Sequence, residues 1–314
     1  MASRATNEAG RGQARGDGQL ARAYFALAGL TYGLIVLGAL VRAHGAGLSC
    51  PDWPLCFGDV IPQLDFKIAF EFGHRVLAGS IAILFALLAA ATLRRPGLGR
   101  ALRPALTIAA GLLALQIVLG GLTVLKLLAS WTVTSHLVTG NAFALALVLT
   151  GRRVAAELSR AGSAAGAPAT TAATALERAM TTTVALLLAC QIVLGGLVSS
   201  NYAGLVCPDW PTCMAGEYFP TFTGIQGLHV LHRTLAYTLM AVLPLAALLA
   251  RRSPELARWL GLASGIALCQ GIVGIANVLL RIPVEITALH SALAAALVCT
   301  LGISVQVAWR RRPS

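Results

Sequence analysis

Four histidines in apolar stretches carry the chemistry that this sequence suggests. His74 and His136 lie in the first half of the chain, and His232 and His290 occupy the matching places in the second half. Imidazole is a standard axial ligand of haem iron, and the interior of a helical bundle is a common place for such a site. The sequence therefore predicts one iron porphyrin held between two imidazoles in each half.

The expected depth of these histidines supports the same interpretation. At 1.5 Å per residue, His74 lies roughly 10 Å and His136 roughly 6 Å from the near ends of their expected helices, and the second-half pair lies at similar depth. A single buried histidine would more often be a hydrogen-bonded core residue or a proton relay. Zinc is disfavoured because neither half offers three or four ligands at zinc spacings within its helices.

An arginine follows one histidine of each pair, as Arg75 and Arg233. A guanidinium at this place can pair with a haem propionate, a carboxylate that suits its forked donors. The alternative is an arginine that anchors its helix at the membrane interface. We expect the propionate role for both residues.

Glu71 marks a difference between the halves. It lies one turn before His74 on the same helix face, and its counterpart in the second half is His229. A carboxylate beside a porphyrin edge can exchange protons during a reaction. The presence of Glu71 therefore indicates that the first half is the reactive one. His229 either supports the second haem or takes no part, and the sequence leaves both roles open.

A short motif occurs twice, as CPDWPLC at 50–56 and CPDWPTC at 207–213. Both copies fall in long segments between expected helices, on the side that faces an oxidising compartment. We therefore expect disulfides between Cys50 and Cys56 and between Cys207 and Cys213. Redox-active disulfides usually use a C-x-x-C spacing, which favours a structural role here over exchange with a partner.

The elements that must position these residues are membrane helices. Hydrophobic residues make up 57% of the chain and charged residues 11%, a balance that excludes an ordinary soluble domain. Apolar runs near the length of a bilayer span predict helices at 23–43, 67–93, 104–127, 132–150, 178–199, 226–250, 256–280 and 284–308. The predicted fold class is an all-α membrane protein with eight transmembrane helices, arranged as two tandem pseudo-symmetric four-helix bundles related by an axis along the membrane normal.

Clusters of arginine set the expected orientation and boundaries. The net charge is +12, and most basic residues lie near the ends of helices that the positive-inside rule places in the cytoplasm. This pattern argues against nucleic-acid binding and predicts a multi-pass protein of the bacterial plasma membrane with both termini cytoplasmic. We expect a disordered cytoplasmic tail over 1–22, a first half over 23–151, a low-complexity linker over 152–177 and a second half over 178–309.

These features together resemble the heme A synthase family. The resemblance spans about residues 23–308 and rests on the paired CPDWPxC loops, the E-x-x-H-R stretch from Glu71 to Arg75, and the single histidines His136, His232 and His290. The combination of eight helices, an internal duplication and these motifs is specific, although each feature alone is weak. The histidine at His229 departs from the family pattern and leaves the partner of His232 open.

The family oxidises the C8 methyl group of haem O to a formyl group and supplies haem A to terminal cytochrome oxidases. The resemblance implies that His74 and His136 bind the substrate haem and that Glu71 assists its oxidation. It also implies that His232 and His290 ligate a permanent haem b, which relays electrons. The lipid bilayer is the implied environment, and a haem O synthase and oxidase assembly factors are candidate partners.

Other classes of protein remain as alternatives. A di-haem b-type membrane cytochrome that only carries electrons would need the same four histidines, and Glu71 together with the unequal halves favours the enzyme. A transporter built on a parallel repeat would show discontinuous helices near the midplane, where Pro244 is the one proline deep within an expected helix. A haem O prenyltransferase is disfavoured because the chain lacks paired Asp-rich motifs for a magnesium diphosphate.

Overall fold

The structure, a computed structural model, describes residues 2–162 and 172–310. Its long helices are α1 (Ala2–Ala43), α2 (Phe66–Leu93), α3 (Pro96–Leu125), α4 (Ser130–Gly162), α5 (Ala175–Ser200), α6 (Gly224–Leu249), α7 (Pro254–Leu279) and α8 (Val284–Ala308). Within the described residues, these eight helices are long and apolar enough to cross a membrane. The predicted all-α membrane protein with eight spanning helices is therefore confirmed.

Helix α1 is longer than expected. Its membrane-spanning part covers Gly18–Ala43, but the helix begins at Ala2. The residues of the expected tail over 1–22 that the structure describes are thus helical. The tail contains no proline, and a helix that is already nucleated by a membrane span extends at little further cost.

The connection between the halves is shorter than the expected linker. Helix α4 continues to Gly162, well into the segment predicted as linker, and residues 163–171 of that segment lie outside the described part of the chain. Thr174 and Glu177 then form a capping box at the start of α5, in which the Thr174 amide donates to Glu177 Oε2 at 2.6 Å. This cap fixes the start of the second-half helices at Ala175.

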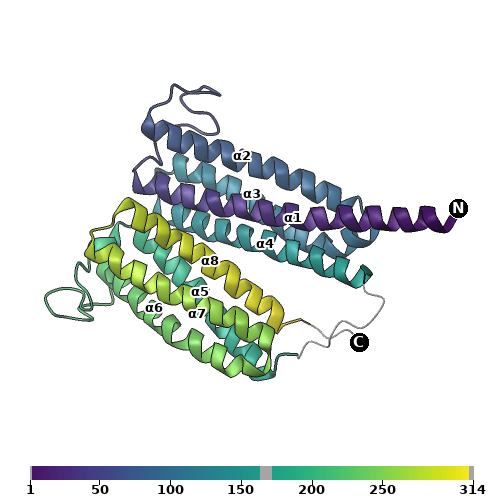
Figure 1. Cartoon of the computed structure of the whole chain (residues 1–314). Coiled ribbons are helices and arrows are strands. Elements are labelled where there is room, and N and C mark those ends of the chain that lie inside the picture. Colours follow the sequence, from purple (N-terminus) through teal and green to yellow (C-terminus); the bar gives the residue numbers. More distant parts are fainter. Residues whose placement is uncertain (1, 163–171, 311–314) are drawn as a thin grey trace.

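Each half of the chain builds its own hydrophobic core. Tyr24 and Leu147 belong to a buried cluster made by the first half, and Leu243 and Leu301 belong to one made by the second half. The halves meet along α1 and α4 on one side and α5 and α8 on the other. Helices α2 and α3 and helices α6 and α7 therefore form the two outer sides of the molecule (Figure 1).

Both long loops lie at one end of the molecule, which we call the loop end (Figure 1). Residues 44–65 follow α1 there, and residues 201–223 follow α5. Polar contacts join the halves at this end, where Arg42 Nε donates to Ser199 Oγ at 2.8 Å. At the opposite end, Arg152 Nε donates to Gln306 Oε1 at 2.8 Å. The bundles are thus tied to each other at both ends of the interface.

Candidate functional site

Two disulfide-closed loops lie over the bundles at the loop end. Cys50 is joined to Cys56 with an S–S distance of 2.00 Å, and Cys207 is joined to Cys213 at 2.07 Å, as the sequence predicted. All four cysteines are at most 1% exposed. Because a thiol partner must reach the sulfur atom it attacks, this burial favours the structural role of the bridges.

The tip of the first loop is held by Asp52. Its Oδ2 accepts a hydrogen bond from the Gly58 amide at 2.8 Å, and its Oδ1 accepts one from the Phe57 amide at 2.7 Å. Both donors have left-handed φ angles, 59° for Phe57 and 77° for Gly58, and glycine adopts such a turn without strain. The bond from Gly58, then that from Phe57 and the charge of Arg75, lowers the pKa of the Asp52 carboxyl group below its usual value.

Acid should loosen this loop tip. Because folding lowers the pKa of Asp52, its contribution to loop stability is present above the unfolded pKa and is lost as the pH falls through the folded value. We expect the Phe57 and Gly58 amides to lose protection from hydrogen exchange below about pH 4, and Asp52→Ala to lose it at neutral pH. Asp209→Ala, at the corresponding place in the second loop, should leave both amides protected. Full protection in Asp52→Ala would contradict the assignment.

An arginine ties each loop to the helix beneath it through three backbone carbonyl oxygens. In the first half, Arg75 Nη1 donates to Asp52 at 2.8 Å and Leu55 at 2.6 Å, and Nη2 donates to Cys50 at 3.0 Å. In the second half, Arg233 Nη1 donates to Asp209 at 2.9 Å and Thr212 at 3.1 Å, and Nη2 donates to Cys207 at 2.7 Å. The same three positions of the repeated motif are therefore bound in both halves.

These contacts limit what the two arginines can offer a ligand. A guanidinium has five N–H donors. Three of them bind loop carbonyls, and the Nε of Arg75 and of Arg233 is also engaged. One N–H on Nη2 remains on each residue, so the propionate role stays a prediction with fewer donors than the sequence suggested.

The Nε atom of each arginine contacts the residue that differs between the halves. Arg75 Nε donates to Glu71 Oε1 at 2.8 Å, and this ion pair is buried, with Glu71 7% exposed. Arg233 Nε donates to His229 Nε2 at 3.1 Å, so His229 carries its proton on Nδ1, which donates to the Ala203 carbonyl at 2.8 Å. Both ring nitrogens of His229 are thus engaged, whereas Glu71 keeps a second carboxylate oxygen.

Each of the four predicted iron ligands lies against a glycine of the preceding helix. The pairs are His74 on α2 with Gly38 on α1, His136 on α4 with Gly120 on α3, His232 on α6 with Gly195 on α5, and His290 on α8 with Gly274 on α7. A Cβ atom on these glycines would lie 3.1 Å from the Cε1 atom of the ring, or 3.2 Å at Gly274. That is closer than an ordinary contact between carbon atoms, so a side chain at any of these glycines would make the ring shift by a few tenths of an ångström.

The Nδ1 atoms of the same four histidines are buried and have no hydrogen-bond partner. A buried polar atom is nearly always hydrogen-bonded, and leaving one alone costs about 1–3 kcal/mol. His74 and His136 belong to the first four-helix half, and His232 and His290 belong to the second. Paired imidazoles with unsatisfied nitrogens fit the requirements of an iron porphyrin held between two axial ligands.

A glutamine on α3 contacts one of these histidines, and α7 carries a glutamine at the aligned position. Gln116 Nε2 lies 3.2 Å from His136 Nε2, while the Oε1 atoms of Gln116 and Gln270 are buried without a partner. Gln116 orients a proposed ligand, and its free oxygen remains available to a bound group.

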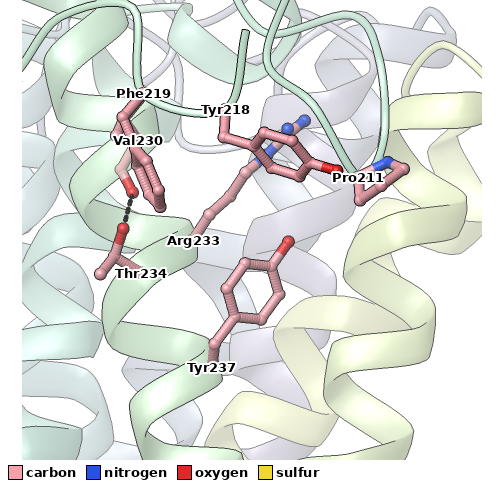
Figure 2. Close-up of a pocket in the computed structure, with 7 residues that line it drawn as sticks. All are labelled: Pro211, Tyr218, Phe219, Val230, Arg233, Thr234 and Tyr237. Atoms are coloured by element: carbon pink, nitrogen blue, oxygen red, sulfur yellow. Dashed lines mark hydrogen bonds between the residues drawn. The ribbon is translucent and has the colours of Figure 1, made fainter. Parts of the chain in front are cut away.

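Figure 2 shows a small pocket where the second loop meets α6. Its lining includes Pro211, Tyr218, Phe219, Val230, Arg233, Thr234 and Tyr237. The Tyr237 side chain points from α6 toward the loop, and its hydroxyl accepts a hydrogen bond from Trp210 Nε1 at 3.1 Å. This bond fastens the second loop to α6, at a position that is Gly79 in the first half.

The predicted site residues of each half lie together at the loop end. Among the described residues, no three His, Cys, Asp or Glu side chains converge as a metal-binding group, so each histidine pair stands by itself rather than within a larger cluster. His44 lies apart from both pairs at the start of the first loop, with its ring 5.2 Å from that of Phe66 and 5.0 Å from that of Phe70. This aromatic packing gives His44 a structural role at the edge of the loop.

Sequence reasoning did not pair each histidine with a particular glycine, and it missed the carbonyl contacts of the two arginines. The repeat held a signal for the glycines, since Gly38 matches Gly195 and Gly120 matches Gly274 when the halves are aligned. The arginine contacts had no such signal. They depend on how the loop folds back over its helix.

Comparisons with known proteins identify the family of this chain. The family model COX15-CtaA, described as cytochrome oxidase assembly protein, matches residues 21–69 and 63–301. The chain is 28% identical to the heme A synthase of Shewanella oneidensis over 90% of this chain and 94% of that protein. It is 29% identical to the heme A synthase of Methylobacterium radiotolerans over 87% of this chain and 85% of that protein. A shorter match covers 38% of this chain and 26% of a protoheme IX farnesyltransferase of Halobacterium salinarum, at 33% identity. The chain therefore belongs to the COX15-CtaA family of cytochrome oxidase assembly proteins.

Proposed function

We propose that this chain is a heme A synthase, an integral membrane oxidoreductase that converts the C8 methyl group of haem O into the formyl group of haem A. The observation that carries the proposal is the duplicated pair of buried histidines, each against a glycine and each with an unpartnered Nδ1. Two such pairs suit two iron porphyrins. Relatives that align over most of the chain are named heme A synthases, which supports the same reaction.

The first half is the proposed substrate site. His74 and His136 would hold haem O there, and Glu71 lies one turn from His74 on α2. His232 and His290 would hold a resident haem b in the second half, where it supplies one-electron redox chemistry when bound. In that half His229 takes the place of Glu71, and with both ring nitrogens engaged it offers no group for proton transfer.

Glu71 is proposed to accept protons that the oxidation of a methyl group releases. Its carboxylate is buried, and Arg75 fixes Oε1 through a hydrogen bond of 2.8 Å. The other oxygen, Oε2, is left as the accepting atom. A positioned side chain of this kind is what general acid–base catalysis requires.

Arg75 and Arg233 are proposed to bind haem propionates with the one N–H that each has left. Each residue directly follows a proposed iron ligand and lies at the loop end, where the polar edge of a porphyrin can approach water. The contact would add a charge-assisted hydrogen bond. It would also link the bound haem to the disulfide loop that the same guanidinium holds.

We further propose that the loop end faces outward from the bacterial plasma membrane and that both termini lie in the cytoplasm. Arginine pairs follow α2 and α6 at the opposite end, as Arg94–Arg95 and Arg251–Arg252, in keeping with the positive-inside rule. The two disulfides suit an oxidising compartment. A haem O synthase would supply the substrate, and factors that assemble a terminal oxidase would receive the product.

The pigment made by living cells tests this function. Cells that express the chain together with a haem O synthase should yield extracted haem A, and cells with the synthase alone should yield haem O. Haem-loaded protein without haem A in the extract would contradict the enzyme and indicate a di-haem cytochrome that only carries electrons. A folded but colourless protein would contradict both functions.

A further inference from the structure

The two bundles differ in where their helices pack closely. In the first half, α1 packs extensively against α4, while α2 contacts α3 much less. In the second half, α6 packs extensively against α7, while α5 contacts α8 less. We call the line of contact between two neighbouring helices a seam, and a seam with few contacts a loose seam. The loose seam of the first half, between α2 and α3, lies on the outer side of the molecule (Figure 1). The loose seam of the second half, between α5 and α8, lies at the interface between halves, and its outer seam is the one between α6 and α7.

The residues along the outer seams differ in size in the same direction. Tyr237 on α6 and Ile275 on α7 are large, and the aligned residues of the first half are Gly79 on α2 and Gly121 on α3. A Cβ atom on Gly79 would meet no other atom within 4 Å. A side chain at Gly79 would therefore leave the backbone into open space, whereas Tyr237 fills the aligned place in the second half (Figure 2).

The loop tryptophans are held in different ways at these seams. A Cβ atom on Gly121 would lie 3.1 to 3.3 Å from three ring atoms of Trp53, so the indole ring lies flat against α3. Trp53 is also 40% exposed. Its counterpart Trp210 is instead fixed to Tyr237 by a hydrogen bond of 3.1 Å. Trp53 covers its seam by packing against a glycine.

The seam of the first half leads to the histidine pair of that half. Gly120, the neighbour of Gly121 on α3, is the glycine against which His136 packs, and the Nδ1 of His136 is buried without a partner. His74 projects from α2, the other wall of the seam. The weakly packed α2–α3 contact is therefore bordered on α3 by the glycine that touches His136, and on α2 by the helix that carries His74.

We propose that the substrate haem enters and leaves the first half sideways from the lipid, through the seam between α2 and α3, with Trp53 as its cover. The proposal rests on the proposed function. Haem O carries a prenyl chain that favours lipid over water, and the outer side of α2 and α3 faces lipid. The resident haem is retained in the second half for two reasons. Tyr237 and Ile275 close the outer seam between α6 and α7, and helices of the first half cover the loose seam between α5 and α8.

Haem exchange in lipid nanodiscs tests the route. The chain is purified with its resident haem, haem O is added in lipid, and uptake is followed by absorbance. Gly79→Tyr installs the second-half residue in open space, so it should keep the resident haem and take up haem O at least about ten-fold more slowly than the wild type. Gly79→Leu repeats the test with an apolar side chain. Gly265→Tyr on α7, where a Cβ also meets no atom within 4 Å, should take up haem O at the wild-type rate.

The reciprocal variant opens the second half. Tyr237→Gly should release the resident haem to a haem-scavenging protein at least about ten-fold faster than the wild type does. If the wild type takes up no second haem, the substrate site and the proposed function are both wrong. If the wild type takes up haem O and both Gly79 variants do so equally fast, only the route between α2 and α3 is overturned.

Discussion

The His232→Ala and His290→Ala variants should lose the resident haem completely, whereas His74→Ala and His136→Ala should keep it and form no haem A. Each imidazole is expected to supply one of the two axial bonds to one iron. The two pairs belong to separate bundles with separate cores, so loss of one haem should leave the other bundle folded. An absorbance spectrum of each purified variant, with pigment extraction from the same cells, measures both effects.

His44→Ala is the matched control for the histidine series. Its ring packs on Phe66 and Phe70 at the edge of the first loop, so its removal should change neither the resident haem nor the product. If His74→Ala alone strips all bound haem, the proposed division of labour between the halves is wrong.

Glu71→Gln should abolish haem A formation while both haem sites still fill. General acid–base catalysis typically contributes about 10²- to 10⁴-fold, so the ratio of haem A to haem O in extracts should fall at least about 100-fold. Glutamine keeps the shape of glutamate, and its carbonyl oxygen can still accept the hydrogen bond from Arg75 Nε. The contacts between Arg75 and the first loop should therefore persist.

His229→Gln is the corresponding change in the second half. It alters the other residue that receives the Nε–H of an arginine, and it should leave haem A formation near the wild-type level. Glu71→Asp, which restores a carboxylate, should recover part of the activity. Wild-type haem A from Glu71→Gln would show that Glu71 takes no part in proton transfer.

Much of the fold could be predicted because the membrane imposes simple rules. Runs of apolar residues near the length of a bilayer mark the helices directly, and the repeated CPDWP motif made the duplication visible. The paired histidines followed from the same repeat, since two residues at equal depth in two copies are hard to explain as isolated core residues. The disulfides followed from loop position and spacing.

The features that were not predicted depend on contacts between distant parts of the chain. The sequence places Arg75 beside a proposed ligand, but only the folded loop brings the carbonyls of Cys50, Asp52 and Leu55 to its guanidinium. The helical start of α1 at Ala2 was not expected because the polar composition of the first residues is typical of a disordered tail. Their continuity with the membrane span favours a helix instead. The unequal seams arise from packing between helices that are distant in the sequence. The pattern of residue types along one chain does not predict such packing.

The number and type of haems bound to each purified chain, after co-expression with a haem O synthase, is the most direct measurement. We predict one haem b per chain, dependent on His232 and His290, with haem O or haem A bound in addition and dependent on His74 and His136. A folded chain that binds no tetrapyrrole, or that keeps its full haem content when all four histidines are replaced, would contradict two iron porphyrins each held between a pair of imidazoles.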